Sequence, residues 1–149
     1  MQQEMITANN ISNEFLKKIL DSAYIRNEIH SNGEIKIVEG IKAFARISES
    51  QKSIKLIVGY GFKEDATLEE KMKFVNKIND EYIMIKAYVI GSESGSRFEY
   101  DMFYEGGLTK AAFVLVLRRF VRIVPHAVKE YGDGIIAPRK TLTTPPSVG

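Results

Sequence analysis

The stretch LTKAAFVLVLRRFVRIVPHAVKEY, residues 108–131, decides the fold. It follows two glycines, which allow a sharp change of chain direction after the preceding strand. Apolar residues run unbroken from Ala111 to Leu117, and three arginines then place charge on one side. The pattern predicts one long helix whose apolar face exceeds the roughly 100° stripe that packing on a sheet requires. We expect Pro125 to kink or restart this helix, because proline has no backbone N–H to donate.

Composition limits the class of protein. The chain has 149 residues, a net charge of +2 and no cysteine, and its hydrophobic content of 44% is ordinary for one folded domain. The absence of cysteine excludes disulfides, thiolate catalysis and cysteine metal sites. The first residues lack the basic and apolar regions of a secretory signal. Two arginines also interrupt the longest apolar run well before the roughly 20 residues that span a bilayer. We therefore expect a cytoplasmic protein without membrane contact.

The first half of the chain predicts a helix followed by four strands. After a loose segment at residues 1–9, apolar residues recur at helical spacing from Ile11 to Leu20. From Tyr24 to Tyr60 they recur at every second position, which is typical of strands with one buried face. Short polar turns separate these runs, and such turns join antiparallel neighbours. This half is therefore predicted to form an antiparallel meander.

The second half predicts a helix, two strands and the long final helix. Thr67 and Glu70 have the spacing of a capping box, which predicts the start of a helix. Strands are expected at residues 82–90 and 98–104, and the first of them is apolar on both faces, which predicts an interior position. Glycine and proline recur in residues 132–149, which we expect to be a flexible tail. The predicted class is α+β with a mostly antiparallel sheet, in the order α-β-β-β-β-α-β-β-α.

Three stretches carry a resemblance to a known family: the hairpin Ser31–Arg46, the helical segment Val75–Asn79, and Phe98–Leu108 running into the last helix. Together with the order of elements, they resemble the YbjN family of bacterial regulators over a domain spanning residues 10–131. The resemblance implies a fold similar to that of type III secretion chaperones, which are small, often dimeric proteins that bind segments of partner proteins. It implies neither an enzymatic activity nor a cofactor.

The resemblance and the broad apolar face favour a non-catalytic protein-binding function. We expect a segment of another protein to dock on an apolar surface formed by the sheet and the last helix. Phe113 and Leu117 are predicted to contact this segment, with Arg118, Arg119 and Arg122 as its polar rim. A homodimer is also consistent with the resemblance.

A second hypothesis is a small-ligand receptor or enzyme. Asn76 and Asn79 would then line a pocket with the carboxylates Glu99 and Asp101. The structural interpretation is that Asn79 caps its helix and Asn76 bonds a neighbouring strand or loop. The carboxylates, with Glu105, then mark a solvated strand face.

A third hypothesis is a nucleic-acid-binding regulator that uses the arginine face of the last helix. The low net charge and the lack of aromatic residues interleaved with these arginines do not favour it. His30 and His126 lack ligand spacing and there is no cysteine, so no metal site is predicted. Phosphate-loop and serine-nucleophile motifs are also absent.

Overall fold

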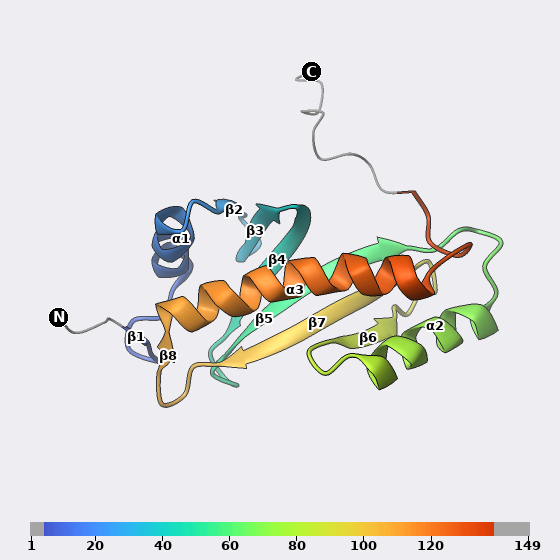
Figure 1. The fold of residues 1–149 in the computed structure, drawn as a ribbon. Coiled ribbons are helices and arrows are strands. Elements are labelled where there is room, and N and C mark those ends of the chain that lie inside the picture. The colour runs from blue at the N-terminus through green and yellow to red at the C-terminus, as the bar shows by residue number, and fades with distance from the viewer. Residues whose placement is uncertain (1–4, 139–149) are drawn as a thin grey trace, which may run out of the picture.

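The computed structural model describes residues 5–138, and Figure 1 shows their arrangement. Three helices and a six-stranded antiparallel sheet make up most of this part of the chain, beside a small two-stranded sheet. The predicted class and the predicted order of the main elements are confirmed. In chain order the elements are β1 (Met5–Ile6), α1 (Asn13–Ser22), β2 (Arg26–Ile29), β3 (Glu34–Glu39), β4 (Ile41–Ser48), β5 (Ser53–Gly61), α2 (Leu68–Glu81), β6 (Lys86–Val89), β7 (Gly95–Phe103), β8 (Leu108–Thr109) and α3 (Lys110–Tyr131).

The large sheet has the order β2-β3-β4-β5-β7-β6, with every neighbouring pair antiparallel. Helix α3 lies across one face of the sheet, where it contacts β4, β5 and β7 (Figure 1). Helix α1 packs beside β2 at one border, and α2 packs beside β6 at the other. The sheet therefore has an inner face, covered by helices, and an outer face turned away from α3.

The hydrophobic core lies between α3 and the inner face of the sheet. Along β5, Ile54, Leu56 and Val58 alternate inward and are fully buried, as the period of two predicts. They meet the apolar stripe of α3, in which buried residues recur every three or four positions. The buried residues of α3 are Phe113, Leu117, Phe120, Val121, Val124, Ala127 and Val128.

Side-chain caps fix where the helices begin. The Oγ1 of Thr67 accepts a hydrogen bond from the backbone N–H of Glu70, and the Glu70 carboxylate accepts one from the N–H of Thr67. This is the predicted capping box. Ser12 and Thr109 cap α1 and α3 in the same way, through one hydrogen bond each.

Helix α3 is continuous through Pro125, so the prediction that it restarts there is wrong. Proline removes one hydrogen bond, the one that would reach the carbonyl of Val121. The buried side chains of Val124 and Ala127 lie on either side of it and hold both halves of the helix on the same core. Packing therefore outweighs the loss of a single backbone bond.

The predicted interior strand is a short strand at the sheet edge. Only Lys86–Val89 is extended in the pattern of a sheet, and β7 lies between β6 and β5. The preceding residues form an irregular connection in which Ile83 is fully exposed. The sequence of this strand is apolar on both faces because α2 covers the edge. Ala87 is therefore as buried as a residue of an interior strand, and sequence alone does not distinguish the two positions.

Both terminal segments also differ from the expectation, within the described residues. Met5–Ile6 pairs with Leu108–Thr109, and the side chain of Ile6 is fully buried, so residues 5–9 are not loose. At the other end Ile135 is buried, and its carbonyl accepts a hydrogen bond from the N–H of Lys63. Residues 132–138 are therefore packed on the chain that follows β5. The rest of the predicted tail, residues 139–149, lies outside the described residues.

One side chain satisfies the exposed backbone of the β6 edge. The Nδ2 of Asn79 donates to the carbonyl of Ala87 at 2.9 Å, and the Ala87 N–H donates to its Oδ1 at 2.8 Å. Asn79 was expected to cap its own helix, but the C-cap residue is Tyr82. Asn79 instead completes the hydrogen bonds of an edge strand.

We predict that Asn79→Ala lowers the free energy of unfolding by about 1–2 kcal/mol, because it leaves the N–H and C=O of Ala87 without their partners. Urea unfolding followed by circular dichroism measures the change. Asn76→Ala is the matched control: Asn76 lies on the exposed side of the same helix, and the change should stay within about 0.5 kcal/mol. Equal losses in both variants would contradict the role assigned to Asn79.

Candidate binding surface on helices α1 and α3

A groove of about 440 Å³ runs between α1 and the first half of α3. Its apolar part comes from both helices, with Phe15 on α1 facing Ala111 and Val114 on α3. Lys18 and Lys110 add positive charge to its lining. The ammonium group of Lys110 lies 5.5 Å from the centre of the Phe15 ring, a cation–π contact that joins the two helices. The groove thus combines apolar area with basic groups.

Arg118 closes one end of this region. Its Nη2 donates to the carbonyl of Ala23 at 2.9 Å, and its Nε donates to the carboxylate of Glu39 at 3.0 Å. The guanidinium therefore holds the end of α1, the end of β3 and the middle of α3 together. Arg118 was predicted to be a rim residue for a partner, but these two contacts engage it within the chain.

Arg119 and Arg122 are exposed on α3, and no ion pair within residues 5–138 engages either of them. Between Lys110 and Lys129 the helix carries no acidic residue. The exposed side of α3 is therefore positive over most of its length, next to the basic groove. Such a face attracts acidic groups, and its attraction weakens as salt increases.

Tyr24 lies beside the groove, immediately after Ala23. Its side chain is 95% exposed, and its φ of 59° is in the left-handed region. This residue occupies the position after the helix that glycine usually takes, since the N–H of Ile25 reaches back to the carbonyl of Leu20 at 2.9 Å. A tyrosine here is strained and buries little of its ring, so the fold itself gains nothing from it. Exposed tyrosine is common at the centre of protein interfaces.

Phe113 and Leu117 were predicted to contact a partner, but both side chains are fully buried. They belong to the core between α3 and the sheet, and no partner can reach them in the folded domain. The surplus apolar face of α3 is also largely absorbed, because α1 and the sheet cover most of it. Leu115, at 57% exposed, is the large hydrophobic side chain of the described helix that stays open to solvent.

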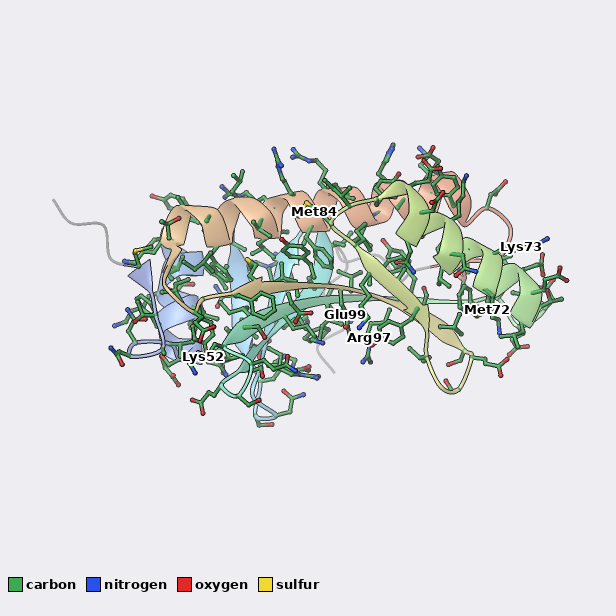
Figure 2. The ribbon with its side chains drawn as sticks, turned by 90° about the horizontal axis from the view of Figure 1, so that it is seen from below. Lys52, Met72, Lys73, Met84, Arg97 and Glu99 are labelled. Atoms are coloured by element: carbon green, nitrogen blue, oxygen red, sulfur yellow. The ribbon has the colours of Figure 1, made fainter. Side chains whose placement is uncertain are left out.

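The outer face of the sheet mixes charged side chains with apolar ones, among which Phe103 is 62% exposed. Figure 2 shows Arg97 and Glu99 on the side of β7 that faces away from α3. Along one row of the sheet, Glu34, Arg46, Lys55 and Asp101 lie opposite one another in turn. The outer pairs, Glu34 with Arg46 and Lys55 with Asp101, attract each other, whereas the middle pair, Arg46 and Lys55, carries like charges.

Glu99 is the buried member of this charged face. Tyr88 donates to its carboxylate at 2.6 Å, and the ammonium group of Lys55 donates at 3.2 Å. Burial by itself would raise the pKa of Glu99, but these two hydrogen bonds outweigh burial and hold the pKa below its usual value. The carboxylate is therefore a paired anion and not a proton donor near neutral pH.

The structure does not bring the proposed ligand-pocket residues together. Asn79 is engaged with the β6 edge, Asn76 is exposed on α2, and Glu99 and Asp101 lie on the outer face of the sheet. Glu105 is exposed in the turn after β7. A second cavity of about 370 Å³ lies elsewhere, between α2 and the end of α3, and its lining includes none of them.

The described residues contain neither a candidate metal site nor a helix long and apolar enough to cross a membrane. His30 and His126 lie on different parts of the fold, and no three His, Asp or Glu side chains of residues 5–138 gather as a metal site would require. In the same part of the chain, none of the helices combines the length and the apolar character that crossing a membrane requires.

Sequence reasoning missed four members of this surface, namely Lys18, Tyr24, Lys110 and Leu115. Tyr24 was taken as the start of a strand, although the helical period ends at Leu20 with neither glycine nor asparagine after it. That missing helix-ending residue was the available signal for an unusual backbone position. The contact between Lys110 and Phe15 had no comparable signal, because these residues are far apart in the sequence.

These observations define an α+β domain with a helix-covered antiparallel sheet and a basic, partly apolar surface on its helices. The sequence profile of YbjN, a family described as "putative bacterial sensory transduction regulator", matches residues 12–137. The chain therefore belongs to the YbjN family. No curated protein matches it.

Two solved structures are similar in fold. The crystal structure of YbjN, described as a putative transcription regulator from E. coli, has a TM-score of 0.72 and 12% sequence identity. The match covers 86% of this chain and 97% of that one. An uncharacterized protein from Methanothermobacter thermautotrophicus has a TM-score of 0.55 and 14% identity, over 82% of this chain and all of the other. At these identities the likeness concerns the fold.

We predict that Tyr24→Gly raises the free energy of unfolding by about 0.5–1 kcal/mol, because glycine adopts a positive φ without strain and the lost ring is exposed. Urea unfolding measures the change. Ser22→Gly, inside the exposed last turn of α1, should instead lower stability by about the same amount. A loss of stability in the Tyr24 variant would show that the ring supports the fold.

We predict that Glu99→Gln is less stable than the natural chain by about 1–3 kcal/mol at pH 7, because the ionised carboxylate accepts two hydrogen bonds. A carboxyl whose pKa is lower in the folded chain stabilises it above the unfolded value of about 4.5, and this contribution is lost as pH falls. The difference between the two proteins should therefore shrink below pH 4.5. Unfolding curves from pH 7 to pH 3 test this, with the exposed Glu105→Gln as control.

Proposed function

We propose that this chain is a non-catalytic regulatory module that binds an acidic segment of another protein on its α1–α3 surface. We define this surface by the groove between the two helices, the exposed Leu115 and Tyr24, and the arginines Arg119 and Arg122. The family description, which names regulation and no reaction, supports the coarse part of this function. The observation that carries the finer part is the pair of exposed arginines, Arg119 and Arg122, on a helix with no acidic residue before Glu130, close to a groove with apolar and basic lining.

Charge complementarity specifies the partner's chemistry. The groove offers Lys18 and Lys110, and the neighbouring turns of α3 offer two arginines that are not engaged within residues 5–138. The acidic Asp21 of α1 lies away from the groove, where it accepts a hydrogen bond from Asn27 and contacts Lys17. Glu14 is exposed on α1 one turn before Lys18. A partner segment that carries Asp or Glu therefore meets attraction chiefly at the lysines of the groove and at the two arginines.

The apolar contacts specify the rest of the segment. Phe15 and Val114 supply partly covered hydrophobic area inside the groove, and Leu115, the next residue of α3, is exposed outside its lining. A polar rim around an apolar strip is the usual composition of a protein-binding surface. We therefore expect one or two apolar side chains of the segment to enter the groove while its carboxylates contact the arginines. An amphipathic helix with an acidic side satisfies both requirements.

The first experiment identifies the segment and tests its chemistry. A photo-cross-linking amino acid replaces Leu115 in the full chain, which is irradiated in lysate of the native host, and mass spectrometry locates the attached peptide. We expect an acidic segment with apolar residues. A synthetic copy of that segment should bind the natural chain with an affinity that decreases as salt increases.

We predict that Arg119→Glu/Arg122→Glu weakens binding of this synthetic peptide by about tenfold or more, because two attractions become repulsions at the rim of the surface. Isothermal titration calorimetry gives the dissociation constants. The control Lys63→Glu/Lys73→Glu makes the same change of net charge at exposed positions outside α1 and α3 and should bind within about twofold. Equal weakening in both variants, or a cross-linked segment without acidic residues, would refute the proposal.

A further inference from the structure

The two edge strands of the sheet, β6 and β2, differ in how their outward backbone groups are hydrogen-bonded. Figure 1 places β6 at one border and β2 at the other. At β6, the outward N–H and C=O of Ala87 are both bonded to the side chain of Asn79. This arrangement prevents another strand from pairing there, which is a common protection of edge strands.

At the β2 border such protection covers only Ile25, just before the strand: its carbonyl accepts a hydrogen bond from the Nδ2 of Asn27, and its N–H donates to the carbonyl of Leu20. The N–H of His30 donates to the carbonyl of Glu34, so His30 and Glu34 form a hydrogen-bonded pair of the antiparallel ladder. Alternation along β2 then turns the backbone N–H and C=O of Asn27 and Ile29 away from β3. Within residues 5–138, no hydrogen bond satisfies these outward groups. They form a short open template for another strand.

The side chains of β2 are complementary to those of a second copy. An antiparallel strand pairs with itself when a residue lies opposite its own equivalent, and pairing of the outward groups of Asn27 and Ile29 allows centres on Asn27, Glu28 or Ile29. Centred on Asn27, the pairing places Arg26 of each copy opposite Glu28 of the other, twice across the symmetry axis. Both side chains are exposed on the outer face. No ion pair engages Arg26 within the described residues, and the carboxylate of Glu28 lies 3.7 Å from the Nε2 of His30.

We propose that β2 is a self-association edge, on which a second copy of this chain adds its own β2 in antiparallel register centred on Asn27. The resulting dimer has one continuous sheet, with six strands from each copy. Two Arg26–Glu28 ion pairs fix the register on the outer face, since a shift that centres the pairing on Glu28 would place two carboxylates opposite each other.

The residues that flank β2 agree with this register. Tyr24 of one copy comes beside His30 of the other, and His30 already makes an edge-to-face contact with Phe44 at 6.1 Å between ring centres. An exposed, strained tyrosine thereby gains aromatic neighbours that it lacks in the single chain. The inference and the proposed function share Tyr24, but the two can be tested separately, because Arg26 and Glu28 lie outside the α1–α3 surface.

The test uses charge exchange between Arg26 and Glu28, which are exposed and contribute little to the fold of one copy. Sedimentation velocity of the full chain over a concentration series measures self-association. Arg26→Glu alone and Glu28→Arg alone each put like charges opposite each other, and each should weaken dimerisation by on the order of tenfold. The double exchange Arg26→Glu/Glu28→Arg restores opposite charges and should return the affinity to near that of the natural chain.

Mixing the two single variants provides an independent check. Each associates poorly with itself, but the pair is complementary, so an equimolar mixture should form a heterodimer of near-natural affinity. Circular dichroism confirms that every variant folds. A natural chain that stays monomeric throughout the series would overturn the proposal and leave this edge to a strand of another protein. Dimers that are insensitive to both single exchanges, or a double exchange that fails to restore affinity, would also overturn it.

Discussion

Burial of the α3 stripe against the inner face of the sheet is the contact on which the rest of the structure depends. Phe113, Leu117, Phe120 and Val124 are fully buried there, and each contributes on the order of 2 kcal/mol relative to an exposed side chain. This packing sets the rotation of the helix about its axis. Arg119 and Arg122 must then face outward, because they lie on the side of the helix opposite the buried stripe, while Arg118 reaches the end of α1. The basic surface is therefore a geometric consequence of the core.

The same arrangement makes the two ends of the sheet unequal. Helix α2 overlaps the β6 border and supplies Asn79 to its backbone. Helix α1 packs beside β2, but Asn27 contacts it through its side chain alone, at Asp21 and Lys17. The outward backbone of β2 consequently has no partner within residues 5–138. The proposed binding surface and the open strand lie at this same end, where Arg118 of α3 contacts Ala23 and Glu39.

Much of the fold was predictable because its signals are local. The capping box at Thr67 was read correctly, and the alternation along β5 identified Leu56 and Val58 as inward residues. The candidate site was predictable only in part. Arg119 and Arg122 were correctly expected to be exposed, since charged residues are rarely buried. Phe113 and Leu117 were wrongly assigned to a partner, because an apolar face looks the same whether the chain or another protein covers it.

The sequence by itself determined the helices, most of the strands and the antiparallel class, since hydrophobic period, caps and turns act over a few residues. It also determined that α3 would carry positive charge and no acid before Glu130. Tertiary structure alone decided that β6 is an edge strand and that Asn79 hydrogen-bonds the backbone of Ala87. It also decided that Arg118 of α3 contacts the ends of α1 and β3. These features depend on which segments distant in the chain become neighbours. That choice follows from the packing of the whole core and has no local signature.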